Sequence, residues 1–189
     1  MNSQLEKVIK KVRIILTDVD GVLTDGAVYM GNDNTEFKRF SILDGPAFAM
    51  ARVAGLKVII VSGRYSPATE SRARELGLEN DCYQGELDKM IIYEKVKEKY
   101  GFTDDEAAFV GDDLIDLSVM KNVALPIAVA NAHSLVKETA RLTTIASGGE
   151  GAFREAVELI LKSQGIYEAT LKRLRKKVLT KNRVDNGEE

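Results

Sequence analysis

The sequence predicts an α/β protein with a doubly wound parallel sheet, and three observations support this fold class. Short apolar segments rich in β-branched residues alternate with longer segments of helical periodicity. Glycines follow several helical segments, where helices commonly stop. Acidic or hydroxyl-bearing residues stand directly after several apolar segments. Such alternation indicates a sheet covered by helices on both faces, with right-handed crossovers between its strands.

The first half of the chain contains two predicted sheet strands and one insertion. "VRIILT", residues 12–17, is the first strand. The stretch "AVYMGNDNTEFKRFSI", residues 27–42, interrupts the alternation and is typical of two strands joined at residues 31–34, so we expect an inserted β-hairpin. "FAMARVAG" predicts a helix that stops at Gly55, and "KVIIVS", residues 57–62, is the next strand.

The middle of the chain continues the alternation. Ser66 and Pro67 fit the N-cap and first position of a helix that stops at Gly77. "DCYQG", residues 81–85, is a short strand, and "LDKMIIYEKVKEKYG" is an amphipathic helix closed by Gly101. These elements form another strand and helix pair of the predicted sheet.

The last part of the chain begins with a capping-box pattern from Thr103 to Glu106, which leads into the strand "AAFVG". "PIAVAN" predicts a further strand, "SLVKETA" a short helix and "AFREAVELILKSQG" a longer one. We therefore expect one domain over residues 8–165 and a basic tail over residues 166–189. The first part of the tail is compatible with a helix, and "TKNRVDNGEE", from residue 180, is expected to be disordered.

Composition narrows the classes of function. The chain has 189 residues, 44% hydrophobic and 30% charged, as in a globular domain that buries a core of its own. Its formal net charge of -2 gives no global attraction to nucleic acid or to a membrane surface, so we expect neither as a partner. The single cysteine, Cys82, excludes an internal disulfide and fits a reducing compartment. With neither a signal peptide nor a membrane-spanning run recognisable, the expected location is cytoplasmic.

Two aspartates, Asp18 and Asp20, follow the first predicted strand, one residue apart. Aspartate and glycine are common turn formers, so this pair could serve only to end the strand. Alternatively, both carboxylates lie at the carboxyl edge of a parallel sheet, where open α/β folds bind their ligands. Their mutual repulsion would then be offset by a divalent cation with oxygen ligands.

Other predicted strand ends carry polar residues as well. Ser62, Gly63 and Arg64 end the second sheet strand, "FVGDDLID" places acids after a later one, and Lys89 stands in the first turn of a helix. In a doubly wound sheet these groups converge on one edge. Burying so many charged groups is costly unless a ligand binds there, so we expect a functional site at this edge.

This set of motifs resembles the haloacid dehalogenase superfamily of phosphotransferases. "DVDGVLTDG" resembles the first motif of that superfamily, "VSGR" the second, Lys89 the third and "GDDLID" the fourth, in the same order along the chain. The matches cover most of residues 12–120. The resemblance implies a Rossmann-like haloacid dehalogenase fold and phosphoryl transfer through an aspartyl phosphate.

The resemblance also implies a role for each motif residue. Asp18 would be the nucleophile, and Asp20 the general acid that later activates water as a base. The ligands of Mg²⁺ would be Asp18, the backbone carbonyl of Asp20, and Asp112. Ser62 and Lys89 would donate to the phosphoryl oxygens. The supporting residues, which would orient Lys89 and metal-bound waters, are Asp113 and Asp116, although Asp116 could instead be a solvated helix position.

The intervals after Asp20 and Ser62 leave no room for a separate cap domain. The resemblance therefore narrows to the capless branch whose members hydrolyse 3-deoxy-D-manno-octulosonate 8-phosphate, a lipopolysaccharide precursor. It spans roughly residues 12–165 and includes "NTEFKRFSILDG", "CYQGELDK", "VANAH" and "SGGEGAFREAVELILKSQG". In that branch four chains assemble through their hairpins and a neighbour covers the site, so a homotetramer is expected. The C-terminal tail can also reach an adjacent site in that branch.

Only a few residues of the resemblance bear on the choice between an eight-carbon and a nine-carbon substrate. A sister activity acts on a nine-carbon keto-acid 9-phosphate and tends to carry Glu at the position of Arg64, whereas Arg64 suits the carboxylate of an octulosonate. Gly63 and Arg72 are further candidates for contact with the substrate, with a solvated surface arginine as the alternative for Arg72. Two residues depart from the pattern of octulosonate enzymes: Tyr65 replaces a lysine, and Glu150 stands in "GGEG" where "GGRG" is common.

Two other residues favour ordinary structural roles, and two competing functions remain open. His133, the only histidine, starts a predicted helix and is expected to cap or pack it. Cys82 is expected to be a small buried apolar residue. The basic run "LKRLRKK" raises nucleic-acid binding as a competing function, and a non-catalytic regulatory or scaffolding domain of this fold is another. The complete set of acidic, hydroxyl and lysine residues favours an enzyme.

Overall fold

The computed structural model describes residues 3–33 and 35–185, with side chains up to residue 177. Six parallel strands form its central sheet, in the order β5-β4-β1-β6-β7-β8. Their bounds are β1 (Ile14–Thr17), β4 (Lys57–Ser62), β5 (Cys82–Gln84), β6 (Ala107–Gly111), β7 (Leu125–Ala128) and β8 (Leu142–Thr143). The strand order reverses beside β1, so a switch point of a doubly wound sheet lies there.

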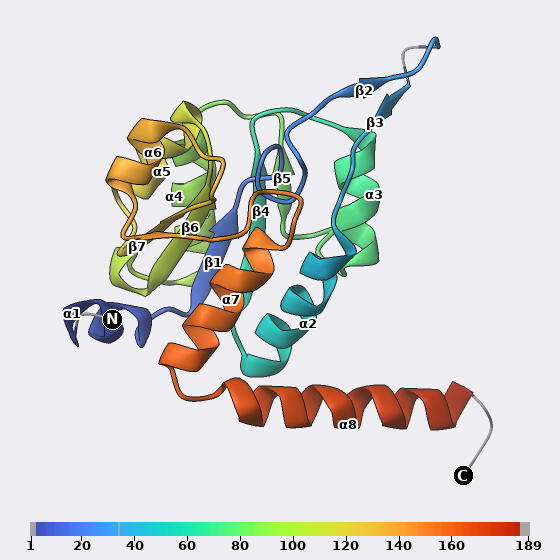
Figure 1. Cartoon of the computed structure of the whole chain (residues 1–189), viewed down its shortest axis with the longest axis vertical. Helices are drawn as coiled ribbons and strands as arrows, with labels where there is room; N and C mark the ends of the chain where they lie inside the picture. The colour runs from blue at the N-terminus through green and yellow to red at the C-terminus, as the bar shows by residue number, and fades with distance from the viewer. Residues whose placement is uncertain (1–2, 34, 186–189) are drawn as a thin grey trace.

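Helices cover both faces of this sheet (Figure 1). One group, α4 to α6, lies on one side, and α2, α3 and α7 lie on the other. The bounds are α2 (Gly45–Ala54), α3 (Pro67–Glu75), α4 (Lys89–Tyr100), α5 (Leu117–Met120), α6 (Ser134–Thr139) and α7 (Ala152–Ser163). Three short 3₁₀ helices are η1 (Ile42–Asp44), η2 (Asp104–Glu106) and η3 (Leu114–Asp116). This arrangement confirms the predicted fold class.

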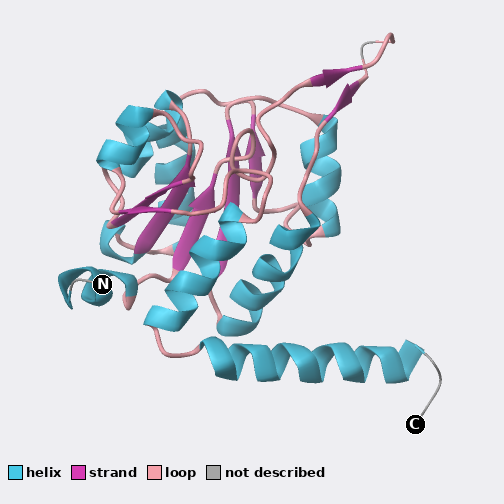
Figure 2. Ribbon diagram, in the orientation of Figure 1, coloured by secondary structure: helices cyan, strands magenta, loops and turns pink. Residues whose placement is uncertain are grey.

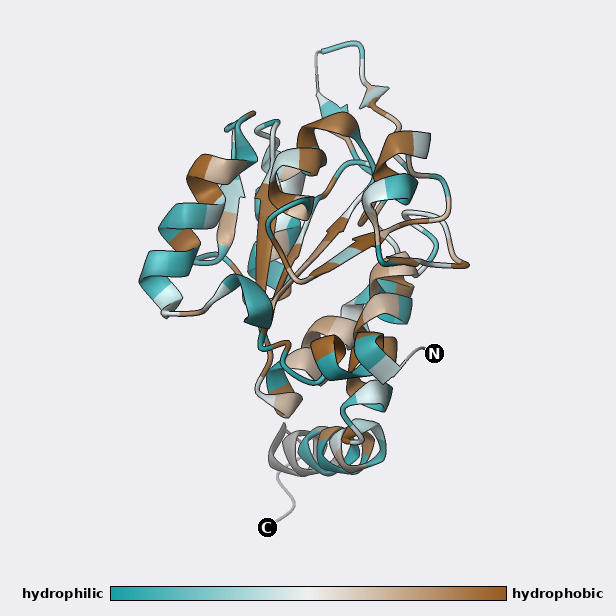
Figure 3. Cartoon of the chain, turned by 90° about the vertical axis from the view of Figure 1, so that its left-hand side faces the viewer, coloured by the Kyte–Doolittle hydropathy of each residue, from teal (hydrophilic) through white to brown (hydrophobic). Residues whose placement is uncertain are grey.

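The central strands are buried on both faces, because helices pack against each side. Every residue of β1 and β6 is buried, and the hydrophobic residues of the strands stand out in Figure 3. In this register Thr17 lies opposite Ile60 of β4 and Val110 of β6. The chain therefore leaves β1 at Asp18 between two neighbouring strand ends, which positions the first motif.

Several local predictions are confirmed. The left-handed residues Gly55 and Gly101 end α2 and α4. Ser66 is the N-cap of α3 and Pro67 its first residue, although the Ser66 hydroxyl makes no capping hydrogen bond. The capping box at Thr103 is present and starts η2. Apart from the short 3₁₀ helices, the described elements that were not expected from the sequence are α1 (Ser3–Ile9), the four-residue α5 and the two-residue β8.

The inserted hairpin of residues 27–42 projects from the body of the protein (Figures 1 and 2). Its strands β2 (Tyr29–Met30) and β3 (Glu36–Phe37) pair antiparallel and are only two residues long. Met30 and Phe37 are more than half exposed. Phe40 differs, because it bridges to Thr24 and packs against the core. The free apolar surface of the hairpin is therefore smaller than its sequence indicates.

The C-terminal segment forms α8 (Tyr167–Asp185), which packs against α2. Leu171 and Leu174 contact the core at helical spacing, and Thr170 is buried. The helix thus continues beyond residue 180, where disorder was expected; residues 186–189 lie outside the described part of the chain. In the described range, no helix has the length and apolar character that crossing a bilayer requires.

Candidate active site

The sheet brings three of the predicted site residues to one edge. Asp18 directly follows β1, Ser62 is the last residue of β4, and Asp112 directly follows β6. Because β1 pairs with both β4 and β6 in parallel, all three strand ends point the same way. The predicted convergence is confirmed.

Lys89 lies at the centre of this edge. It is the first residue of α4, whose N-cap Asp88 accepts a hydrogen bond from the backbone of Met90. A lysine is unfavourable at a helix N-terminus, which carries a partial positive charge. Here the side chain is fully buried, and Nζ lies 2.6 Å from a carboxylate oxygen of Asp18 and 2.6 Å from one of Asp116. Burial alone would lower the pKa of Lys89, but the two carboxylates hold it above its ordinary value.

Asp116 supports the site from η3. Its Oδ1 accepts from Lys89, and its Oδ2 accepts from the backbone N–H groups of Asp112, at 2.9 Å, and Asp113, at 3.2 Å. A side chain at Gly111 would place its Cβ 2.6 Å from the same Oδ2, so only glycine fits. Asp116 is completely buried, which excludes the alternative that it is a solvated helix position.

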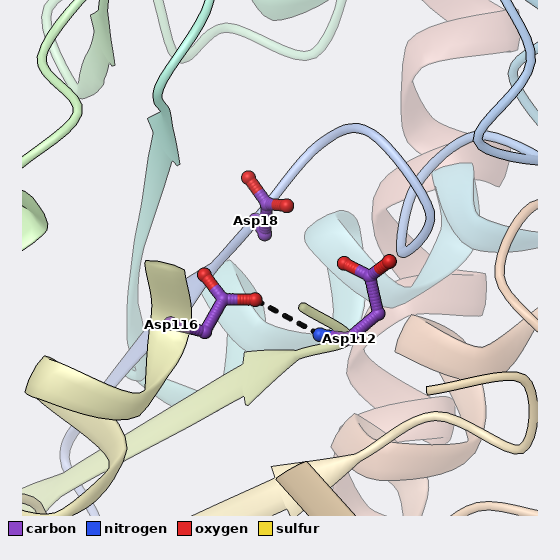
Figure 4. Close-up of side chains that lie close together, drawn as sticks. All are labelled: Asp18, Asp112 and Asp116. Carbon is purple, nitrogen blue, oxygen red and sulfur yellow. Dashed lines mark hydrogen bonds between the residues drawn. The ribbon is translucent and has the colours of Figure 1, made fainter. Parts of the chain in front are cut away.

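Carboxylate oxygens of Asp18, Asp112 and Asp116 lie within 4.8 Å of one another (Figure 4). Burial, followed by repulsion from Asp116, raises the pKa of Asp18, although Lys89 opposes this shift. Burial and the neighbouring acids raise the pKa of Asp112 as well. Oδ1 of Asp112 is buried and accepts no hydrogen bond from any described residue. Clustered carboxylates with a free, buried oxygen fit a hard divalent cation such as Mg²⁺.

Asp20 lies outside this cluster. Its carboxylate accepts hydrogen bonds from Lys38 Nζ, at 2.7 Å to Oδ1 and 2.8 Å to Oδ2. Lys38 follows β3 of the hairpin. In the sequence it belongs to "NTEFKRFSILDG", part of the resemblance, and no role of its own was predicted for it. No local pattern identifies it, because Lys38 and Asp20 are 18 residues apart and their contact depends on how the chain returns from the hairpin to the body of the protein.

The second motif forms a tight loop after β4. The Ser62 hydroxyl donates to the backbone carbonyl of Arg64 at 2.8 Å and accepts from the Arg64 N–H at 3.3 Å. A Cβ at Gly63 would lie 3.2 Å from the side-chain ends of both Ile115 and Leu87. The Arg64 guanidinium lies 2.7 Å from Glu36 of the hairpin. The loop is thus placed beside both the cluster and the hairpin.

Two predicted site residues, Arg72 and Asp113, have side-chain contacts away from the cluster. Arg72, in α3, donates to Glu75 at 2.8 Å and to the carbonyl of Ser41 at 3.4 Å. Asp113 is exposed and caps η3 by accepting from the backbone of Leu114 at 2.7 Å. Arg72 thus links α3 to the segment before α2. Asp113 caps the N-terminus of the short helix that carries Asp116.

A second loop braces the first motif and was missed as a contributor to the site. Gly149 N donates to the carbonyl of Val22 at 3.0 Å, and Gly148 N donates to Asn131 Oδ1 at 2.7 Å. A Cβ at Gly148 would collide with the Gly21 carbonyl. The sequence signal was "SGGEG" itself, since adjacent glycines permit such a close approach of two backbones.

His133 and Cys82 have the ordinary roles expected of them. His133 is the N-cap of α6, and its Nδ1 accepts from the backbone of Leu135 at 3.2 Å. Cys82 is partly buried, and burial raises the pKa of its thiol to about 11. The His133 imidazole is thus engaged in capping α6, and the raised pKa keeps the Cys82 thiol protonated and unreactive at neutral pH.

The fold and the site together define a haloacid dehalogenase-like hydrolase, and residues 80–152 match that family. The 3-deoxy-D-manno-octulosonate 8-phosphate phosphatase of Escherichia coli K12 is 41% identical over 156 residues, which are 82% of each chain. The chain therefore belongs to the family of haloacid dehalogenase-type phosphatases that this enzyme represents. It is a phosphoric monoester hydrolase.

Two solved structures have the same fold. The octulosonate 8-phosphate phosphatase of Yersinia pestis is 37% identical, has a TM-score of 0.86, and covers 89% of this chain and 90% of its own. The enzyme of Moraxella catarrhalis was solved with magnesium ion, phosphate ion and KDO; it is 31% identical, has a TM-score of 0.87, and covers 92% of this chain and 99% of its own. The predicted superfamily is confirmed.

Proposed function

We propose that this protein is a Mg²⁺-dependent phosphatase that hydrolyses 3-deoxy-D-manno-octulosonate 8-phosphate to the free sugar acid and phosphate, in lipopolysaccharide precursor synthesis. The observation that carries the chemistry is the buried contact of Lys89 with both Asp18 and Asp116, beside the free oxygen of Asp112. The substrate is inferred from the relatives and is supported by their high coverage of this chain.

In this proposal Asp18 is the nucleophile. One of its carboxylate oxygens attacks phosphorus, the bond from phosphorus to the sugar oxygen breaks, and Asp20 gives its proton to that oxygen. Asp20 then removes a proton from water, which attacks the phosphorus of the aspartyl phosphate and releases inorganic phosphate and the free Asp18 carboxylate. The carboxyl of Asp20 thereby returns to its protonated form.

We assign the magnesium ion to Asp18, Asp112 and the backbone carbonyl of Asp20. Mg²⁺ bound there supplies positive charge that offsets the repulsion between the Asp18 carboxylate and the substrate phosphate. Ser62 and Lys89 donate hydrogen bonds to the phosphoryl oxygens, where charge gathers during transfer. Asp116 keeps the Lys89 ammonium aimed at Asp18, as their contacts support.

The sugar carboxylate is assigned to Arg64, beside Gly63 in the second-motif loop. Arg64 pairs with Glu36, so a substrate carboxylate would replace the Glu36 carboxylate as its partner. The guanidinium is about half exposed and accessible from solvent. The contacts of Arg72 with Ser41 and Glu75 favour a structural role, and we assign it no contact with substrate.

We further propose a homotetramer assembled through the hairpins, in which a neighbouring chain covers the site. Exposed apolar side chains on the hairpin support it: Val28, Tyr29, Met30 and Phe37. Exposed apolar residues also lie on the loops and helix starts at the carboxyl edge of the sheet: Tyr65, Leu87, Leu114 and Ile115. A cytoplasmic location accords with the absence of an internal disulfide partner for Cys82.

A phosphate-release screen of sugar-acid phosphates in the presence of Mg²⁺ tests the proposed function. We expect a kcat/KM for octulosonate 8-phosphate well above that for a nine-carbon keto-acid 9-phosphate. Asp18→Asn is the control, since an amide is a poor nucleophile of nearly the same size. Preference for the nine-carbon ester would move the assignment to the sister activity. Equal release by Asp18→Asn would exclude Asp18 as the nucleophile.

A further inference from the structure

The ion pair between Lys38 and Asp20 differs from the other hairpin ion pairs in its burial and its geometry. Nζ of Lys38 lies 2.7 Å and 2.8 Å from the two carboxylate oxygens of Asp20, so both oxygens are engaged at once. The Lys38 side chain has no exposed surface, whereas Arg39 and Arg64 are about half exposed. A lysine on a projecting surface hairpin is ordinarily solvated, whereas this one contacts a site residue.

The other carboxylate near Lys38 belongs to Glu36. Its Oε1 is 3.8 Å from Lys38 Nζ, beyond hydrogen-bond distance, and its Oε2 pairs with Arg64 at 2.7 Å. Glu36 Oε1 itself is buried and accepts no hydrogen bond from the described residues. Lys38 therefore makes its short contacts with Asp20, and Glu36 lies near the ammonium without a hydrogen bond to it.

We propose that Lys38 is a positioning residue that holds the carboxyl of Asp20 in the orientation required for proton transfer to the departing sugar oxygen. This inference rests on the proposed function, in which Asp20 is the general acid. Lys38 has no role as a proton carrier, because an ammonium group only donates hydrogen bonds. When Asp20 is protonated, its carbonyl oxygen still accepts from Lys38 and leaves the hydroxyl free to face the substrate.

Orientation matters for a general acid, because proton transfer requires a hydrogen-bond distance to the leaving oxygen. About a quarter of the Asp20 side chain is exposed, and among the described residues the side chain that donates hydrogen bonds to its carboxylate is Lys38. Lys38 follows directly after β3, so the position of the hairpin sets the position of the ammonium. The hairpin thereby contributes to the chemistry from within its own chain.

The test compares two phosphate esters with different leaving groups. The alcohol of glycerol phosphate needs a proton as it leaves, whereas 4-nitrophenolate leaves without one. Since kcat/KM reports the steps up to the first irreversible one, it isolates the departure of the alcohol. Lys38→Met should lower kcat/KM for glycerol phosphate by about 10- to 100-fold, while kcat/KM for 4-nitrophenyl phosphate changes by less than about threefold.

Matched variants separate positioning from a structural effect. Arg39→Met removes the neighbouring cation, which pairs with Glu150, and should leave kcat/KM for both esters unchanged. Lys38→Arg keeps the charge and should recover part of the loss. Asp20→Asn should likewise lower kcat/KM for glycerol phosphate more than for 4-nitrophenyl phosphate. Adding Lys38→Met to Asp20→Asn should lower kcat/KM no further, because Lys38 acts through Asp20.

Each result has one meaning. An equal fall for both esters in Lys38→Met would show a structural role, and an additive loss in the double variant would show that Lys38 acts independently of Asp20; either overturns the inference. Wild-type protein that hydrolyses both esters but not octulosonate 8-phosphate would refute the proposed substrate alone. Inactivity of the wild type on every ester would remove both proposals.

Discussion

Lys89 and Asp116 form an ion pair with 2.6 Å between Nζ and Oδ1, and neither side chain has any exposed surface. Burying two charges is costly, and their attraction repays the cost only when the remaining polar atoms are also satisfied. Here the second oxygen of Asp116 accepts two backbone N–H groups, and Lys89 also contacts Asp18. The pair therefore fixes the loop after β6 to the start of α4.

Lys89→Met should destabilise the protein strongly, because it leaves the buried carboxylates of Asp18 and Asp116 without their cation. We expect a loss of about 3–5 kcal/mol in the free energy of unfolding, measured by urea denaturation. Lys11→Met is the matched control: its ion pair with Asp105 is mostly exposed, so the loss should be below about 1 kcal/mol. Equal losses in the two variants would contradict a closed, buried pair at Lys89.

Gly21→Ala should impair the site more than the fold. Gly21 has a φ of +93°, and its added Cβ would collide with the Asp112 carboxylate. Gly55→Ala offers the same kind of backbone strain, at φ +84°, with open space around the added Cβ. We expect each to cost about 1 kcal/mol in stability, but only Gly21→Ala to lower kcat, on the order of a hundredfold. If Gly21→Ala and Gly55→Ala lost kcat to the same extent, backbone strain alone, and not the contact with Asp112, would be responsible.

Removal of divalent metal by a chelator should abolish phosphate release, and Mg²⁺ should restore it better than Ca²⁺. Calcium takes more ligands at longer distances, so it would misplace the phosphoryl group relative to Asp18. Phosphate release from 4-nitrophenyl phosphate, after dialysis and readdition of each ion, measures this. Equal recovery with both ions would argue against a geometric role for the metal.

The free energy of unfolding should depend on pH through Asp44, which is buried and accepts a hydrogen bond from the backbone N–H of Arg154. Burial raises its pKa to about 6. The folded protein therefore holds the Asp44 proton more tightly than the unfolded chain. The stability that this proton contributes is complete below the unfolded pKa and is lost as pH rises through about 6.

Asp44→Asn keeps an acceptor for the Arg154 N–H but has no charge to bury. Its free energy of unfolding, relative to wild type, should increase by about 2 kcal/mol between about pH 4 and about pH 8. Urea denaturation at several pH values measures this difference, from which the contributions of other titrating groups cancel. A difference that stays constant with pH would show that Asp44 has the same pKa in the folded and unfolded states.

Phe37→Glu should weaken the proposed assembly, because Phe37 is 58% exposed on the hairpin. We expect the mass in solution to fall from a tetramer toward a monomer, with a higher KM for the sugar-acid phosphate. Ile145→Glu is the control, since Ile145 is 92% exposed in a loop outside the hairpin. Phe40 is unsuitable for this test, because it packs against the core. A fully active wild-type monomer at micromolar concentration would refute the assembly.

The sequence by itself determined the sheet, most of its helices and the motif residues at its edge. Apolar strands such as residues 57–62 and stops such as Gly55 and Gly101 are local signals, and each was found where expected. Parallel strands with adjacent ends then bring Asp18, Ser62 and Asp112 together by topology alone. Periodicity gave no such signal for the four-residue α5 or the two-residue β8, which are too short to show it.

Only the tertiary structure decided which charged groups meet. The "GDDLID" resemblance implied that Asp116 orients Lys89 but left a solvated helix position open. The structure decides, because Lys89 and two backbone N–H groups satisfy the buried Asp116 carboxylate. Lys38 reaches Asp20 because the chain returns from β3 to the body of the protein beside the first motif, and Arg72 contacts Ser41 rather than the cluster. Local sequence sets the conformation of a segment, but a contact between distant side chains depends on the packing of the whole chain.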